Sequence, residues 1–241
     1  AATLSATNLI DEIILSMHTY NILSFISKSI PDNRAHNTVI PYNLVWALTI
    51  AAKMKIKTSL SDIPYAITNH RTLAKLGYTL IDIDSGLNRG LMRESSIRFL
   101  IGKYDKETLI QGYNRVVQDY IMPRMSMEPN IHILDCTDIE VNYFNSNYEG
   151  SGVAHSKRSP CGMEEKARGY KLSTLRGVVN DSGIIEEIRF GPLNTHDLTL
   201  SEEMLRTSPV LKPGDILIND RGFLSRNLIN YLKTIRQVDT Y

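Results

Sequence analysis

Cysteine is scarce in this sequence, which has only two, Cys136 and Cys161, among 241 residues. Two thiols are too few for a structural zinc site and do not form a disulfide framework, so thiol chemistry is not expected. Long hydrophobic runs are also lacking: uncharged apolar stretches such as residues 44–52 fall well short of the roughly 20 residues that cross a bilayer. No basic-then-apolar signal segment opens the chain. We therefore expect a cytoplasmic protein that does not bind a membrane.

The chain also lacks a strong charge of either sign. It has 27 Lys and Arg against 26 Asp and Glu, and a net charge of +1. Residues 1–130 hold 14 basic against 11 acidic side chains, and residues 131–241 hold 13 against 15. This weak asymmetry favours an N-terminal part that contacts something anionic and a C-terminal part that gathers carboxylates. A hydrophobic content of 42% indicates a globular chain that can bury a core.

Residues 1–130 show the 3.6-residue apolar period of α-helices. A first helix follows Ile10, and Pro41 can open a second. A full apolar stripe then runs over residues 109–121 behind the capping residue Asp105. We expect residues 1–130 to form a helical domain.

A compact segment within this region combines capping residues with three lysines. Ser61 or Asp62 would cap one short helix, Asn69 could cap the next, and Gly77 could end it. Two short helices beside basic side chains are typical of helix-turn-helix DNA binding. A small helical subdomain with solvated lysines explains the same pattern equally well. The lysines are Lys53, Lys55 and Lys57.

From residue 131 the apolar period changes to two, which indicates strands. A hairpin is expected about residues 180–183, and residues 144–165 read as an irregular polar loop. The predicted order is β-β-β-α-β-α, so the chain belongs to the α+β class with a second domain over residues 131–241. The expected elements are strands 131–143, 166–179, 184–190 and 215–220, helices 200–207 and 225–234, and a strand that starts near Gln237.

One aspartate lies on the apolar face of the first of these strands. Asp135 shares its face with Ile131 and Ile133, whereas Asp138 shares the more polar face with Glu140. A carboxylate on an apolar face loses hydration and must recover it from a cation, a metal or several donors. Asp135 is therefore a candidate site residue, and Asp138 is the second choice.

A second aspartate ends a later strand. Asp220 follows Ile216 and Ile218 on one face, at the end of the strand where mixed sheets place their sites. If Asp220 and Asp135 came together, they would repel each other unless a divalent cation neutralised them. The structural alternative is that one aspartate caps a turn and the other pairs with a neighbour such as Arg221.

Four short motifs follow one another in the C-terminal half. They are Asp-Cys-Thr at 135–137, Lys-Ala-Arg-Gly-Tyr-Lys-Leu at 166–172, Asn-Thr-His-Asp at 194–197 and Ile-Asn-Asp-Arg-Gly-Phe at 218–223. The specificity lies in the ordered set, because no single motif would suffice. Over residues 131–236 the chain resembles bacterial insertion-sequence transposases of the DDE class.

This resemblance implies a ribonuclease H-like core, in agreement with the predicted order of elements. It implies that Asp135 and Asp220 are the first and second catalytic carboxylates. The third, a Glu on a later helix, should follow an insertion after Asp220, but the only acid after that position is Asp239. Glu202 and Glu203 precede Asp220 and do not fit the order. We therefore expect a chain truncated before the third acid, with an incomplete site.

The resemblance also implies a cofactor and further site residues. Two Mg²⁺ or Mn²⁺ ions would be bridged by Asp135, with Asp220 on one ion and the missing Glu on the other. One ion would activate water or a DNA 3′-hydroxyl, and the other would stabilise the leaving oxygen. Thr137 could orient Asp135, and Arg221 could contact a phosphate, although each is as readily structural.

Other polar residues of the motifs are expected to orient a loop or to bind DNA. His196 is expected to orient a loop through Asp197 rather than to bind metal. Three basic residues at the start of one strand are suited to bind the phosphates of the DNA backbone. The alternative is that they are solvated side chains at the end of a strand. They are Lys166, Arg168 and Lys171.

The sequence thus predicts a transposase of a bacterial insertion sequence that cleaves DNA ends and transfers strands. Its expected partners are double-stranded DNA, as transposon ends and target, and a second copy of the chain, because two DNA ends are joined in one complex. It would be associated with the nucleoid. The alternatives are a truncated, non-catalytic relative that regulates by binding DNA or dimerising, and an unrelated hydrolase with a two-aspartate metal site. A helical Glu beyond Tyr241 would favour the enzyme.

Overall fold

The computed structural model describes residues 9–33, 46, 98–99, 102–144, 147–155, 165–180, 182–223 and 225–241. The chain divides into two compact units, residues 1–112 and 113–241. The predicted helix at Pro41 lies outside the described residues, and so does the predicted helix-turn-helix segment. Its three lysines, Lys53, Lys55 and Lys57, therefore remain a sequence prediction.

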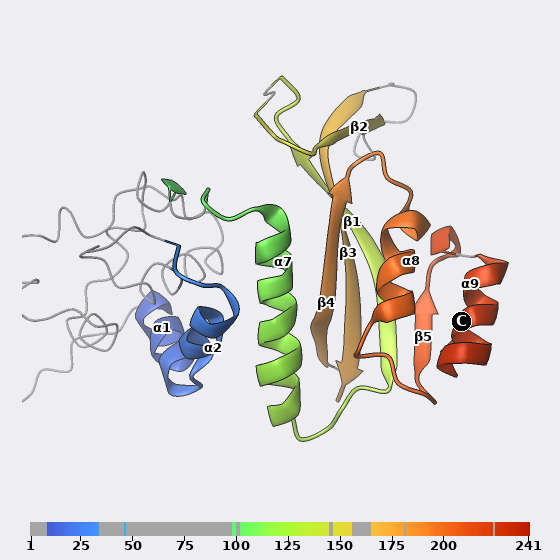
Figure 1. Cartoon of the computed structure of the whole chain (residues 1–241), viewed down its shortest axis with the longest axis horizontal. Helices are drawn as coiled ribbons and strands as arrows, with labels where there is room; N and C mark the ends of the chain where they lie inside the picture. The colour runs from blue at the N-terminus through green and yellow to red at the C-terminus, as the bar shows by residue number, and fades with distance from the viewer. Residues whose placement is uncertain are drawn as a thin grey trace, which may run out of the picture. The chain divides into compact units, whose positions relative to one another are not determined.

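The first unit begins with two helices, α1 (Leu9–Thr19) and α2 (Ile22–Ser29), which Figure 1 shows in blue. Apolar side chains at helical spacing bury one side of each, including Ile14 in α1 and Ile26 in α2. Asn21 joins the helices with a φ of 61°, in the left-handed region that asparagine adopts more readily than most residues. The helix predicted to follow Ile10 is present as α1.

The next described helix, α7 (Lys106–Arg115), continues as a π-helical segment, η3 (Val116–Ile121), and a 3₁₀ turn, η4 (Met122–Arg124). Asp105 caps its start, because the Thr108 backbone N–H donates to Asp105 Oδ1 at 2.7 Å. The apolar stripe predicted over residues 109–121 is helical, but the stretch continues through Pro123 and ends with the 3₁₀ turn at Arg124.

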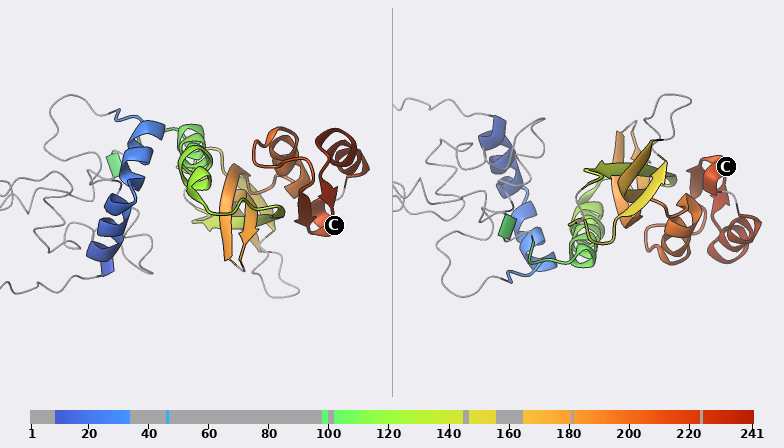
Figure 2. Two further views of the ribbon diagram at one scale, coloured as in Figure 1. Left: turned by 90° about the horizontal axis from the view of Figure 1, so that it is seen from below. Right: turned by 90° about the horizontal axis from the view of Figure 1, so that it is seen from above.

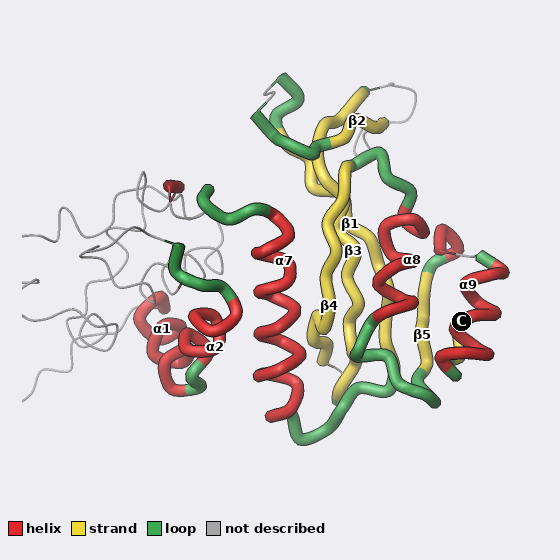
Figure 3. Tube along the Cα trace, viewed as in Figure 1, coloured by secondary structure: helices red, strands yellow, loops and turns green. Residues whose placement is uncertain are grey.

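The second unit is built on a mixed sheet that curls around its helices (Figures 1 and 3). β1 lies between β3, which is antiparallel to it, and β5, which is parallel. β6 extends the sheet beyond β5, and β4 and β2 both pair with the other side of β3. The strands are β1 (Ile131–Val141), β2 (Gly152–His155), β3 (Lys166–Val179), β4 (Ser182–Pro192), β5 (Ile216–Asn219) and β6 (Asp239–Thr240).

The order of elements in this unit follows the sequence prediction, and the α+β class is confirmed here. The hairpin from β3 to β4 turns through Asn180, which has a φ of 48°. The irregular loop predicted over residues 144–165 is wrong for the four residues of β2, because so short a strand shows no clear two-residue period.

Three helical segments complete the second unit. α8 (Asp197–Thr207) follows β4, and α9 (Arg226–Tyr231) continues as η6 (Leu232–Arg236) between β5 and β6. Figure 2 shows α8 and α9 on the same side of the strands. Among the described residues, no helix has both the length and the apolar character needed to span a membrane.

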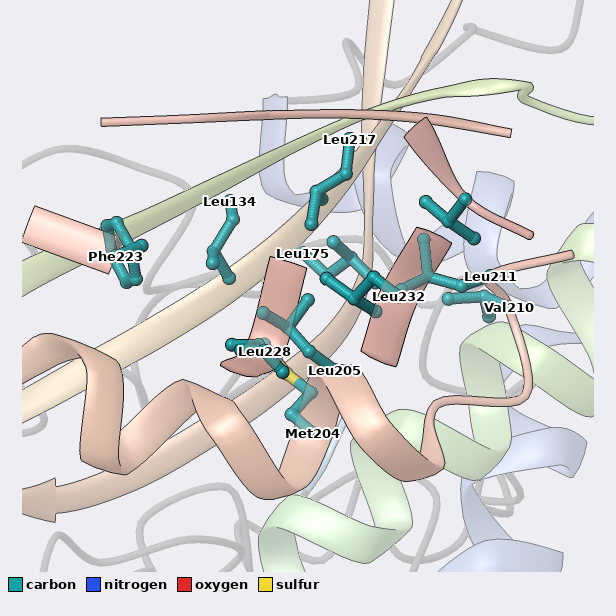
Figure 4. Packing of buried hydrophobic residues seen from close by; sticks show 11 residues of the cluster. Leu134, Leu175, Met204, Leu205, Val210, Leu211, Leu217, Phe223, Leu228 and Leu232 are labelled. Atoms are coloured by element: carbon teal, nitrogen blue, oxygen red, sulfur yellow. The ribbon is translucent and has the colours of Figure 1, made fainter. Parts of the chain in front are cut away.

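The core of this unit lies between the sheet and those helices (Figure 4). Leu134 of β1 and Leu217 of β5 point into it, and Met204 and Leu228 meet them from α8 and α9. Each of these side chains is at most 2% exposed, and complete burial of a leucine or methionine stabilises a fold by about 1.5–3 kcal/mol. The remaining members are Leu175, Leu205, Val210, Leu211, Phe223, Leu232 and Val238.

Side chains from the α7–η3 segment cover the outer edge of β4. Asn114 bonds both backbone groups of Ile188, with its Nδ2 donating to the carbonyl at 3.2 Å and its Oδ1 accepting from the N–H at 3.0 Å. Gln118 Nε2 donates to the Glu186 carbonyl at 3.2 Å. These side chains take the place of a further strand and satisfy backbone groups at the sheet edge.

Candidate functional site

The two predicted catalytic aspartates occupy neighbouring positions at one end of the β1–β5 strand pair. These strands are parallel, with Ile133 opposite Ile218 and Leu134 opposite Asn219. The next residues in this register are Asp135 and Asp220. Asp220 lies just beyond β5 (Ile216–Asn219), so the pairing of the two strands ends at Leu134 and Asn219. The two aspartates therefore directly follow a pair of neighbouring strand residues, and Asp135 lies on the face of β1 opposite to Leu134.

This face is not the one that the helices cover. Asp135 and Asp220 are exposed, whereas Leu134, on the other face of β1, is 2% exposed. The expectation that Asp135 loses its hydration is therefore wrong: α8 and α9 pack on the face of Leu134. Asp135 Oδ1 accepts a hydrogen bond from the Cys136 backbone N–H at 2.8 Å, which orients the carboxylate.

Further polar side chains surround Asp135 on the open face. Thr137 follows two residues later and is exposed. Thr174 lies opposite Asp135 in β3, and its hydroxyl donates to the Asp135 carbonyl at 3.4 Å. Arg176, the exposed partner of Ile133, is on the same face. Thr174 and Arg176 could not be selected from the sequence, because their local pattern does not show the strand register that places them beside Asp135.

Arg221 begins the 3₁₀ turn η5 (Arg221–Phe223), immediately after Asp220. Its side chain lies outside the described part of the structure, so its predicted contact with a phosphate remains a prediction. Among the described residues, no group of three or more His, Cys, Asp or Glu side chains is arranged to hold a metal ion. The ligands that the open face offers are the carboxylates of the Asp135–Asp220 pair.

The opposite face of β1 contains a buried ion-pair cluster. Lys171, 8% exposed, lies beside Asp138 in the strand register, and its Nζ donates to Asp197 Oδ1 and lies 4.0 Å from Asp138 Oδ1. Asp138 therefore lies on the face that the helices cover, where Lys171 and Asp197 are its charged neighbours. Lys171 is also separated from Lys166 and Arg168, which lie on the open face of β3.

His196 stands at the start of α8, beside this cluster. Its Nδ1 accepts a hydrogen bond from the Leu198 backbone N–H at 3.2 Å, so the imidazole serves as the N-cap. The next residue, Asp197, provides the carboxylate for Lys171. A negative side chain in the first turn is also favourable next to the helix N-terminus.

Cys136 and two serines form a small polar group on the covered face. Ser173 Oγ and Ser201 Oγ are 2.7 Å apart, and Cys136 Sγ lies 3.8 Å from Ser201 Oγ. Burial raises the pKa of the Cys136 thiol, and the hydrogen bonds from the serines only partly offset this effect. A thiol with a raised pKa is a poor nucleophile.

A buried triad of ionisable residues joins β1, β4 and the start of β5. No local pattern in the sequence indicated it. His132 of β1 is 0% exposed, and its Nδ1 lies 2.6 Å from Glu186 Oε2 of β4. Its Nε2 lies 3.1 Å from Asp215 Oδ2, just before β5. Burial alone would lower the pKa of His132, but the hydrogen bonds and negative charges of Glu186 and Asp215 outweigh it and raise the pKa.

A β-bulge in β4 makes this triad possible. Leu175 pairs with Glu187 and the next residue, Arg176, pairs with Ile185, so Glu186 is the extra residue. As a result, the consecutive residues Glu186 and Glu187 are both buried. Burial raises the pKa of Glu187, although Ser208 Oγ donates to its Oε2 at 2.6 Å. Two adjacent glutamates in a strand give no sequence signal for such an arrangement.

Searches among protein-family models, curated proteins and solved structures found no match to this chain. Its function must therefore be argued from the residues themselves. The open face of the sheet, with two neighbouring aspartates at the end of the β1–β5 pair, is the candidate site that combines the sequence prediction with the observed register.

Proposed function

We propose that this chain is the helical region and catalytic core of a DDE-class transposase that cleaves DNA ends and transfers strands. The observation that carries the proposal is the parallel register of β1 and β5, whose last pair, Leu134 and Asn219, directly precedes Asp135 and Asp220. The two aspartates come from distant sequence motifs, in the order that the resemblance requires.

The topology supports a ribonuclease H-like core. Three antiparallel strands, β1, β3 and β4, are followed by a helix, a strand parallel to β1, a second helix and a further parallel strand. In such a sheet, the first strand is central and carries the first acid, and the strand that crosses over to its other side carries the second. The short strand β2 is an addition on the β3 edge.

The donor set of the open face fits a hard divalent cation. Asp135 and Asp220 offer carboxylate oxygens, which Mg²⁺ and Mn²⁺ prefer, and their side chains are accessible to hydrated ions. When bound, such ions activate an attacking hydroxyl and stabilise the leaving oxygen of a phosphodiester. The Asp135 carboxylate is held by the Cys136 N–H, and the Thr174 hydroxyl bonds the Asp135 carbonyl, so both fix the strand at this point.

DNA is the proposed substrate, and the N-terminal region is the proposed site that binds the transposon ends, with Lys53, Lys55 and Lys57. Lys166 and Arg168 lie on the same face of β3 as Thr174, so they can contact DNA held at the aspartates. Lys171 pairs with Asp197 and is assigned to the fold instead. We propose that two copies of the chain act together, because each copy would hold one DNA end.

Metal binding by the 241-residue chain tests the site directly. Two carboxylates should hold Mn²⁺ weakly, with a dissociation constant on the order of millimolar, because the ion keeps most of its hydration. We expect Asp135→Asn and Asp220→Asn each to abolish this binding in titrations followed by the electron paramagnetic resonance of free Mn²⁺. Asp239→Asn, at a 58% exposed carboxylate that lies 3.6 Å from Lys233, is the matched control. Binding unaffected by the first two substitutions would remove the site.

A second candidate function is a non-catalytic regulator that binds DNA or dimerises. This function needs no third carboxylate, and among the described residues no group of three or more His, Cys, Asp or Glu side chains is arranged to hold a metal ion. Mn²⁺-dependent nicking of labelled duplex DNA separates the two functions. The 241-residue chain should nick little. If the natural protein continues beyond Tyr241, a longer chain that carries a downstream acidic helix should nick and should lose that activity on Asp135→Ala or Asp220→Ala. DNA binding without any such nicking would support the regulator.

A further inference from the structure

An aromatic pair and an arginine form a defined corner just after β1. We call Tyr143, Phe144 and Arg168 the aromatic corner. The Tyr143 and Phe144 rings meet edge to face, with their centroids 5.5 Å apart. The Arg168 guanidinium lies over the Tyr143 ring, 5.9 Å from its centroid. The corner thus combines two aromatic rings with a cation, the combination that proteins use to stack on nucleobases.

Hydrogen bonds hold the corner in place. Arg168 Nε donates to the Tyr143 carbonyl at 3.2 Å, and Arg168 Nη1 donates to Ser151 Oγ at 3.2 Å. The Phe144 backbone N–H donates to Asn142 Oδ1 at 3.0 Å, which makes an Asx turn. The turn therefore fixes the backbone at Phe144, and the arginine fixes the Tyr143 ring that the Phe144 ring meets.

The Phe144 ring projects into solvent. Its side chain is 93% exposed, the highest value among the exposed large hydrophobic residues of the described chain, and Tyr143 is 40% exposed. Single exposed apolar residues are common on protein surfaces and need no explanation alone. Here, however, the ring stays exposed beside Tyr143 and Arg168, although burial of a phenylalanine is favourable. Such an exposed ring is accessible for packing against a flat apolar surface.

The corner lies within reach of DNA bound at the two aspartates. Arg168 pairs with Val141, six positions after Asp135 on the same face of β1. At about 3.3 Å per residue, this separation is about 20 Å along the strand. It corresponds to about six base pairs of duplex DNA at 3.4 Å each. A DNA strand that ended at the aspartates and ran along β1 would therefore pass the corner within its first turn.

We propose that the aromatic corner is a stacking site for an unpaired nucleobase of the DNA bound along the open face. Phe144 would pack against the face of the base, and Arg168 and the exposed Lys166 on the same face of β3 would attract the adjoining phosphates. The inference rests on the proposed DNA substrate. The polar surroundings of the ring, Asn142 and Ser151 among them, suit one base better than the broad apolar surface of a protein partner.

A double-mutant cycle between the Phe144 ring and the unpaired base tests this proposal. The measurements are made without divalent metal. Fluorescence anisotropy would compare the 241-residue chain on a labelled duplex with a three-nucleotide unpaired segment and on the same DNA with abasic sites there. We expect Phe144→Ala to weaken binding to the first DNA by about 5- to 100-fold, which corresponds to the loss of one stacked base. Phe144→Trp should retain the affinity. Ile235→Ala, at a 67% exposed side chain of η6, should change nothing.

The decisive result is the coupling between the two changes. The abasic DNA should bind wild-type protein as weakly as Phe144→Ala binds the intact DNA, and the substitution should then have no further effect. If Phe144→Ala and the abasic sites weaken binding independently, or if wild-type protein binds neither DNA, the stacking site is refuted. Mn²⁺ binding at Asp135 and Asp220 is measured without DNA, so a failure of the stacking site is distinguishable from a failure of the proposed catalytic site.

Discussion

The buried triad of His132, Glu186 and Asp215 should control the stability of the second unit. Both ring nitrogens of His132 contact a carboxylate, at 2.6 and 3.1 Å, and the imidazole is 0% exposed. Gly177 leaves room for the Glu186 carboxylate, because a Cβ there would lie 2.6 Å from its carboxyl carbon. The triad joins β1, β4 and the start of β5, so its loss should affect the register that places the candidate site.

We expect His132→Gln to destabilise the second unit by about 3–5 kcal/mol, the usual effect of removing one partner from a buried ion pair. The substitution leaves two carboxylates close together in the core without the positive charge between them. Adding Glu186→Gln to this variant should recover part of the loss, because it removes one uncompensated charge. Lys212→Ala is the control: its exposed pair with Glu128 should contribute less than about 1 kcal/mol.

The pH dependence has a definite sign. The folded-state pKa of His132 is raised above its unfolded value, so its contribution is fully present below about pH 6.5 and is lost as the pH rises through the folded pKa. Within this window the free energy of unfolding of wild-type protein should fall by up to about 1.4 kcal/mol per pH unit. Burial also raises the pKa of Glu187, which adds a decrease of the same sign from a lower pH.

Urea unfolding followed by circular dichroism from pH 5.5 to 8.5 measures this effect. The informative quantity is the difference between wild-type protein and His132→Gln at each pH, because the contribution of Glu187 cancels in it. We expect the difference to be largest at pH 5.5 and to shrink as the pH rises. A difference that stays constant, or that grows toward alkaline pH, would show that His132 is neutral in the fold and would refute the charged triad.

Three further predictions follow from the fold and from the sequence. Gly169→Ala should destabilise by more than about 2 kcal/mol, because its Cβ would lie 2.1 Å from a β1 carbonyl, whereas Gly222→Ala, with its closest contact at 3.8 Å, should be nearly neutral in the same urea unfolding assay. Asp197→Asn should cost about 2–4 kcal/mol, since it leaves Lys171 less well paired in a buried position. Residues 1–112 alone, the first compact unit, should bind duplex DNA with a steep salt dependence in anisotropy titrations, and binding by residues 113–241 alone instead would disprove the N-terminal DNA site.

Local patterns in the sequence were sufficient to predict most elements of the second unit. The hairpin about Asn180 depends on a residue that tolerates a positive φ, and Ser225 caps α9 by accepting from the Leu228 N–H at 3.4 Å. That the strands leading to Asp135 and Asp220 are neighbours could also be predicted, because mixed sheets place their sites at the ends of adjacent strands. These features depend on adjacent residues or on a single pairing.

The choice of the covered face could not be predicted in the same way. The alternation of side chains along a strand shows which residues of β1 share a face, but it does not show which face the helices cover. The even-numbered residues of β1, which include His132, Cys136 and Asp138, form one face of the strand. In the sequence this face is the more polar one, yet α8 and α9 pack on it. Its polar groups are satisfied by partners far along the chain, such as Glu186 through a bulge and Lys171 on the next strand. A buried polar group is acceptable only where such partners exist, and only the folded register supplies them. The same register leaves the apolar-looking face of Asp135 open to solvent, which is the condition that a DNA-binding site requires.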